Sequence, residues 1–215
     1  MTAFWTWAAV VATVLVEALY EVLLLRLQKR EPERLARTKH ARLRDDWFEA
    51  VSRQKGSEIL AVQTLRNSLM SATMLASTAA IGLMGTVTLA APSLHAGFDD
   101  AGAWSFSPRL LLELVLLALL FASLVSTLMA VRFYNHAGFI GGMPVDSQAR
   151  SRWSASGVRY VRRAGVLYGV GLRQLVLVVP VVAAILLPLA GPVAAILVAA
   201  VLFSFDRYRD EPAGE

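Results

Sequence analysis

Hydrophobic residues occur along this chain in four long stretches with few or no charged side chains. The stretches cover residues 4–25, 68–91, 110–131 and 174–205. A helix that crosses a membrane needs about 20 apolar residues, because the hydrocarbon layer is about 30 Å thick and each helical residue rises about 1.5 Å. All four stretches reach that length, and in lipid only a helix satisfies its own backbone polar groups. The pattern predicts an all-α fold: one membrane domain over residues 1–215, with a bundle of four transmembrane helices.

The first and last stretches each allow a second interpretation. No basic residue precedes the first stretch and no small-x-small cleavage site precedes Arg26, so we expect a retained anchor and not a secretory signal. The last stretch has 32 residues, roughly 48 Å as one helix, and Pro180, Pro188 and Gly191 interrupt it. We expect one long, proline-kinked helix. The alternative is a break at Gly191, after which Val193–Phe205 forms a short return segment.

Composition and charge support a membrane location and indicate an orientation. The chain is 56% hydrophobic and 17% charged, with a mean hydropathy of +0.55, which is unlike an ordinary soluble domain. Of its 21 Lys and Arg residues, 18 lie in or beside the connections 26–65 and 132–173, and none lies in 92–108. The positive-inside rule then predicts an outside amino terminus and two cytoplasmic connections. The same rule explains the net charge of +5 without nucleic acid. Arg outnumbers Lys 18 to 3, which is typical of a GC-rich bacterium and therefore indicates a bacterial inner membrane.

The cytoplasmic connections are expected to be partly helical. In the first connection a helical projection places five apolar residues on one face: Ala36, Leu43, Trp47, Ala50 and Val51. This helix either lies on the membrane surface, with its arginines reaching anionic lipid, or forms a solvated hairpin. In the second connection the segment Gly138–Pro144 is expected to break the helix, which resumes from about Ser156. In the outer loop, Trp104 and Phe106 are typical of an interfacial anchor.

Ionisable and amide residues at membrane depth form the candidate site, because such groups are costly in lipid. Glu17 and Glu21 are four residues apart and share a helix face. Topology brings most of the others to the same cytoplasmic depth as Glu21. The full set is Glu17, Glu21, Gln63, Arg66, Asn67, Arg132, Asn135, His136, Arg163 and Arg173. Four interpretations remain open: a structural network of paired glutamates and arginines, a pocket for an anionic group, an ion or proton path through the glutamates, and catalysis by His136.

Sequence motifs for catalysis or metal binding are not found. The chain has no cysteine, and His40, His95 and His136 fall on different elements without ligand spacing. We therefore expect no cofactor, no metal and no enzymatic activity. Small residues recur every four positions in the second stretch, at Ser68, Ala72, Ala76 and Ala80. Such a face lets helices approach closely, within the bundle or at a subunit interface.

Two central motifs carry a family resemblance. They are Ile59-Leu60-Ala61-Val62-Gln63-Thr64-Leu65-Arg66-Asn67 and Arg132-Phe133-Tyr134-Asn135-His136-Ala137-Gly138-Phe139. A later pattern adds Arg163-Ala164, Tyr168, Gly171-Leu172-Arg173, Pro180, Gly191-Pro192 and Asp206. Together these resemble the membrane-protein family called domain of unknown function 599, from the first stretch to Asp206. The resemblance implies a multi-pass membrane protein, commonly with four spans, and no established activity.

Two functions are consistent with these observations. The first is a non-catalytic accessory or interaction subunit, or a homo-oligomer, whose basic cytoplasmic face binds anionic membrane lipids. The second is an oligomeric transporter or channel for a small solute or ion, in which Glu17 and Glu21 line the path.

Overall fold

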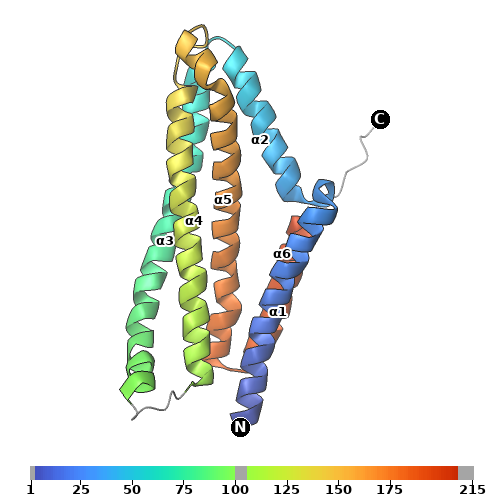
Figure 1. The fold of residues 1–215 in the computed structure, drawn as a ribbon, viewed down its shortest axis with the longest axis vertical. Helices are drawn as coiled ribbons and strands as arrows, with labels where there is room; N and C mark the ends of the chain where they lie inside the picture. The colour runs from blue at the N-terminus through green and yellow to red at the C-terminus, as the bar shows by residue number, and fades with distance from the viewer. Residues whose placement is uncertain (1–2, 100–105, 208–215) are drawn as a thin grey trace. The chain divides into compact units, whose positions relative to one another are not determined.

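Long helices make up the computed structural model, which describes residues 3–99 and 106–207 (Figure 1). The elements are α1 (Ala3–Arg30), the short 3-10 helix η1 (Pro32–Arg34), α2 (Ala36–Arg53), α3 (Glu58–Asp99), α4 (Pro108–Gly141), α5 (Gln148–Leu186) and α6 (Ala190–Asp206). Four of them, α1, α3, α4 and α5, are long and apolar enough to cross a membrane. The predicted all-α class with four such helices is confirmed. The predicted helix in the first connection is also present, as α2.

The helices extend further than the apolar stretches alone. α3 continues through Pro92 to Asp99, and α4 continues through Gly138 to Gly141. The predicted break within Gly138–Pro144 is confirmed, because α4 ends at Gly141, but the prediction that the helix resumes only from about Ser156 is wrong. Only residues 142–147 separate α4 from α5, because Ser147 caps α5 early: its Oγ accepts the Arg150 backbone N–H at 3.1 Å.

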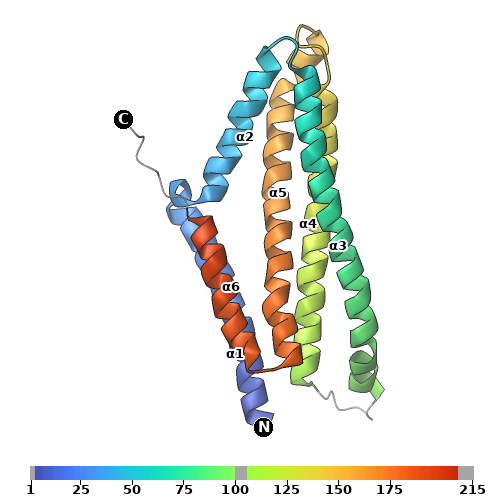
Figure 2. The same cartoon turned by 180° about the vertical axis from the view of Figure 1, so that it is seen from behind.

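The predicted single helix over 174–205 is also wrong, and the return segment is the better description. α5 ends at Leu186 and α6 begins at Ala190. Pro188 has no N–H to continue the helix, and a tight turn forms around it, in which the Ala190 N–H donates to the Leu187 carbonyl at 2.9 Å. α6 then packs along α1, as Figure 2 shows. Pro180, by contrast, lies inside α5.

Contacts within the chain group the described residues into two units, and α3, α4 and α5 contribute to both. The first unit contains residues 3–32, 78–99, 106–123 and 173–207. Its buried core consists of Val10, Leu112, Leu116, Leu120, Val181 and Ala184. Gly191 allows the close approach of α6, since a Cβ at that position would collide with Thr13 Oγ1 and Ala184 Cβ.

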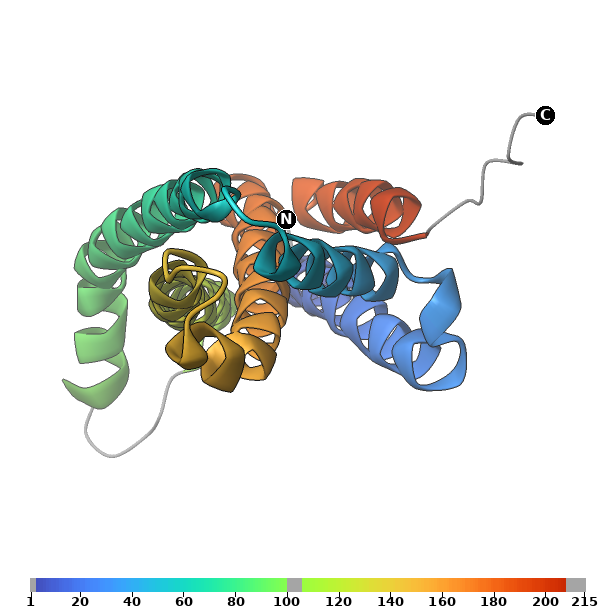
Figure 3. The same cartoon turned by 90° about the horizontal axis from the view of Figure 1, so that it is seen from above.

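The second unit contains residues 33–77 and 124–172. Its buried core consists of Phe48, Leu65, Ala72, Ala130, Tyr134, Ala137, Ile140, Val161 and Ala164. Seen from above in Figure 3, α4 lies beside α5. Four of these core residues are alanines, which let the helices approach closely, and Phe48 and Tyr134 are the largest side chains among them.

The buried face of α2 differs from the predicted one. Phe48 is fully buried, whereas Leu43 is 65% exposed and Ala50 is also exposed. The reason is Gly157 on α5, where a Cβ would overlap the Phe48 ring. The glycine leaves space for that ring, and α2 is rotated to fill it. Of the predicted apolar face, Ala36 and Val51 are buried.

Candidate functional site

Arg173 and Asp206 form the centre of a polar cluster in the first unit. Arg173 Nη2 donates to both Asp206 carboxylate oxygens, at 2.9 and 3.2 Å, and the side chains are only 11% and 17% exposed. The Tyr20 hydroxyl of α1 also donates to Asp206, at 2.6 Å. We call Tyr20, Glu21, Arg173, Gln174 and Asp206 the Arg173–Asp206 cluster. It joins the end of α6 to α1 and α5.

The two glutamates of α1 have different surroundings. Glu21 accepts a long hydrogen bond of 3.4 Å from Gln174 Nε2. Glu17 is 6% exposed, and its Oε1 has no hydrogen-bond partner among the described residues. Within residues 3–99 and 106–207, no ion pair joins either glutamate to an arginine, and Asp206 takes that place opposite Arg173.

A shallow groove runs between α3 and α4 in the second unit. It has a volume of about 350 Å³ and is lined by Val62, Leu65, Arg66, Leu69, Tyr134, Asn135, Gly138 and Phe139. We call it the α3–α4 groove. Its walls are mainly apolar, and Arg66 and Asn135 supply a cationic donor and an amide. Both residues belong to the predicted set, and the structure brings them together from separate helices.

The other predicted residues of the second unit lie outside this groove. Gln63, Asn67 and Arg132 are exposed. His136 is exposed and lies against the Tyr160 ring, with centroids 5.6 Å apart. The Arg163 guanidinium lies 5.9 Å from the Phe133 ring centroid, within the usual range of a cation–π contact.

The polar residues that the sequence predicts to lie at one depth therefore fall into separate groups of contacts. Glu21 and Arg173 belong to the first unit, and Arg66 and Asn135 belong to the second. Each group is defined by its own contacts, and the meeting of the whole set at one depth stays a prediction. Of the aromatic residues expected in the outer loop, Trp104 lies outside the described residues. Phe106 stacks on Trp7 with ring centroids 5.9 Å apart.

Arg150, at the start of α5, is a buried polar residue that the sequence did not single out. It is 1% exposed, donates from Nη1 to the Ile140 carbonyl and from Nη2 to Ser52 Oγ at 3.2 Å, and lies over the Phe48 ring. Most residues around it in the sequence are polar, including Gln148, Ser151 and Arg152, so no local hydrophobic pattern marks it as buried.

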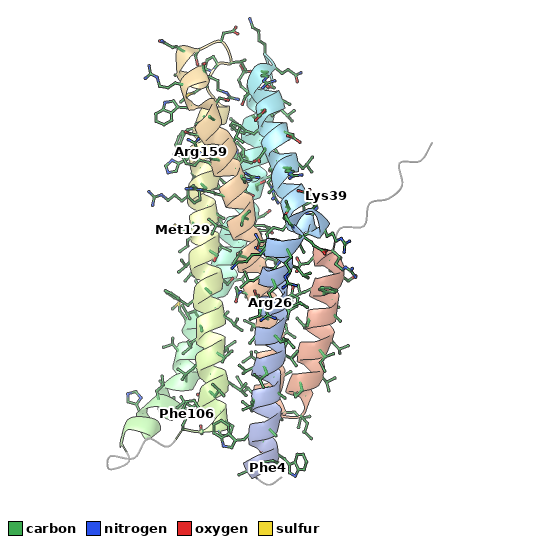
Figure 4. All side chains as sticks on the ribbon, turned by 45° about the vertical axis from the view of Figure 1, so that its right-hand side comes forward. Phe4, Arg26, Lys39, Phe106, Met129 and Arg159 are labelled. Carbon is green, nitrogen blue, oxygen red and sulfur yellow. The ribbon has the colours of Figure 1, made fainter. Side chains whose placement is uncertain are left out.

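Two of the ion pairs in the second unit join segments that are far apart in the sequence. Asp45 Oδ2 lies 3.2 Å from Arg162 Nε, and burial raises the pKa of the Asp45 carboxyl although the arginine opposes that shift. Lys55 Nζ lies 2.6 Å from Asp146 Oδ2, and that hydrogen bond raises the pKa of the Lys55 ammonium. Figure 4 shows many nitrogen-bearing side chains in this part of the unit, around the labelled Arg159. Among the described residues, no group of three or more His, Asp or Glu side chains could hold a metal ion.

The fold and these polar groups define a class: an all-helical protein with four helices long and apolar enough to cross a membrane. The chain belongs to the family described as proteins of unknown function, DUF599, whose model matches residues 8–211. Neither a curated protein nor a solved structure matches this chain. The match covers both units, including the Arg173–Asp206 cluster and the α3–α4 groove.

Proposed function

We propose that this chain is a non-catalytic, multi-pass protein of a bacterial inner membrane that binds an anionic phospholipid in the α3–α4 groove. It would act as an accessory or interaction subunit, either as a homo-oligomer or in a larger membrane complex. The observation that carries the proposal is the make-up of the groove, in which Arg66 and Asn135 border an apolar surface.

The groove fits the two parts of a phospholipid. Val62, Leu69 and Phe139 offer an apolar wall for an acyl chain, and Phe139 is 75% exposed. Arg66 can donate two parallel hydrogen bonds to phosphate oxygens, and the Asn135 amide can donate a further one. Arg66 makes no ion pair within residues 3–99 and 106–207, so its guanidinium is available to a ligand.

The lipid proposal is tested by native mass spectrometry of the full chain purified in mild detergent. We expect retained phosphatidylglycerol, and about tenfold weaker retention in Arg66→Ala, the effect of losing charge-assisted hydrogen bonds. Arg159→Ala is the matched control, because Arg159 is an exposed arginine outside the groove. Equal retention by wild type and both variants would overturn the proposal.

Charge supports an orientation with the amino terminus outside and both basic connections in the cytoplasm. Asp206, at the end of α6, pairs with Arg173 on α5, so residue 207 lies near Arg173. This pairing supports a cytoplasmic residue 207 in the proposed orientation. The chain has no cysteine, so a single Arg207→Cys substitution reports its side without background. Labelling from the outside of intact cells by an impermeant maleimide would contradict this orientation.

A second function, ion or proton transfer, is favoured by one observation. Glu17 is buried at the middle of α1, and its Oε1 has no hydrogen-bond partner among the described residues. An ionisable group placed this way in an apolar helix is typical of a transport path. If the protein transports, Glu17→Gln abolishes flux in proteoliposomes. Flux that survives this substitution would show that Glu17 is structural.

A further inference from the structure

A cavity in the second unit lies where the end of α2 meets the start of α5, away from the α3–α4 groove. It has a volume of about 440 Å³ and is lined by Glu49, Ser52, Arg53, Val145, Arg150, Ser151, Ser154, Ala155 and Val158. We call it the Arg150 cavity. Figure 1 shows the ends of α2 and α4 and the start of α5 side by side here, and the bonds of Arg150 to Ser52 and Ile140 join them. The volume falls in the range of small-molecule sites, about 300–1,000 Å³.

The charge in this cavity is positive and incompletely balanced. Arg150 is 1% exposed, and no carboxylate lies within ion-pair distance of it among the described residues. The one lining carboxylate, Glu49, pairs with Arg53 at 3.5 Å. The Glu58 carboxylate attracts Arg150 only from beyond ion-pair distance, so it offsets only part of the cost of burying the guanidinium. A bound anion would reduce the remaining cost.

Arg150 also has donors to spare. A guanidinium has five N–H groups, and the hydrogen bonds to Ile140 and Ser52 use one each at Nη1 and Nη2. Nε is buried without a partner among the described residues. Three serine hydroxyls, from Ser52, Ser151 and Ser154, line the same space. The donors come from two helices and therefore approach from different directions, which suits a tetrahedral anion with several oxygens.

From this donor set we infer that the Arg150 cavity binds a phosphoryl group. Arg150 supplies the buried charge, the serine hydroxyls donate to the terminal oxygens, and Arg53 attracts the anion at the rim. Val145, Ala155 and Val158 leave an apolar side for the rest of the ligand. The group can belong to a soluble phosphorylated molecule or to a lipid headgroup, and the experiment below distinguishes these sources.

The test is isothermal titration of the full chain in a neutral detergent with pyrophosphate and, separately, with short-chain phosphatidylglycerol. Ser154→Asp places a carboxylate in the cavity, which competes with the ligand while giving Arg150 a counter-charge. We expect saturable binding, and we expect Ser154→Asp to weaken the affinity about tenfold or more, which corresponds to the loss of at least one charge-assisted contact. Ser156→Asp is the matched control, since Ser156 is on the same helix but outside the cavity. It should change binding less than about twofold.

Binding of pyrophosphate that Ser154→Asp weakens identifies a soluble ligand class. Binding of phosphatidylglycerol alone identifies a lipid headgroup in this cavity only if Ser154→Asp weakens it and Arg66→Ala does not. The inference would be overturned if neither probe showed saturable binding that Ser154→Asp weakens. An equal loss in Ser154→Asp and Ser156→Asp would overturn it too, because it would show general charge attraction. Arg66→Ala should leave pyrophosphate binding unchanged, so this inference and the lipid proposal for the α3–α4 groove fail separately.

Discussion

Replacing Asp206 by asparagine tests how the Arg173–Asp206 cluster holds α6. The substitution keeps the size and one acceptor oxygen but removes the charge that receives Arg173 at 2.9 and 3.2 Å and Tyr20 at 2.6 Å. Breaking a buried ion pair costs about 3–5 kcal/mol, because the remaining charge has no partner. Arg173 and Asp206 retain 11% and 17% exposure, and the amide still accepts one bond. We therefore expect a loss of about 2 kcal/mol in the free energy of unfolding.

For a chain of this size, about 2 kcal/mol corresponds to a fall of about 4–8 °C in Tm, measured by thermal unfolding in detergent. Glu33→Gln is the control, because it removes the Arg42–Glu33 ion pair, whose side chains are 56% and 55% exposed. That exposed pair is worth about 0–1 kcal/mol. A Tm for Asp206→Asn equal to that of Glu33→Gln would refute the reasoning, because the cluster would then contribute no more than a surface pair.

Three further predictions concern the second unit. Phe48→Ala should lower the free energy of unfolding by about 3–5 kcal/mol, because that side chain is fully buried. Leu43→Ala should lower it by less than about 1 kcal/mol, because Leu43 is 65% exposed. Similar Tm losses in the two variants would contradict the assigned face of α2. Gly157→Ala should cost about 1–3 kcal/mol because its Cβ would overlap the Phe48 ring, and an unchanged Tm would show that the contact is loose. Burial raises the pKa of Asp45, so the folded state holds that proton more tightly than the unfolded state, and stability falls as pH rises from the ordinary pKa through the raised one. Asp45→Asn should flatten this dependence in denaturation measured against pH, and a slope equal to that of wild type would contradict the assignment.

The length of the apolar stretches predicted the helices well, because backbone hydrogen bonding in an apolar segment leaves few alternatives to a helix. The same pattern did not show which prolines end a helix. Pro92 and Pro180 lie within helices, whereas Pro188 lies in a turn. All three prolines lack the backbone N–H, so the proline alone does not decide whether the helix ends there. That depends on the packing of the surrounding segments, such as the packing of α6 on α1 around Gly191.

The candidate site was predicted only in part, for a related reason. Arg66 and Asn135 stand in recognisable motifs at the ends of apolar stretches, and the structure brings them to one groove. Arg150 gave no signal, because its burial depends on a carbonyl of α4 and a hydroxyl of α2 that are distant in sequence. The partner of Arg173 was also unforeseen, since Asp206 reaches it only after the turn at Pro188 reverses the chain.

The central claim, an anionic phospholipid in the α3–α4 groove, is tested most directly by photo-crosslinking. The full chain is reconstituted with a phosphatidylglycerol that carries a photoreactive group near its headgroup, and the labelled peptides are identified by mass spectrometry. We predict that labels concentrate in residues 62–69 and 134–139, and that Arg66→Ala reduces them while Arg159→Ala does not. Labels spread evenly over the apolar helices, and unchanged by Arg66→Ala, would contradict the claim.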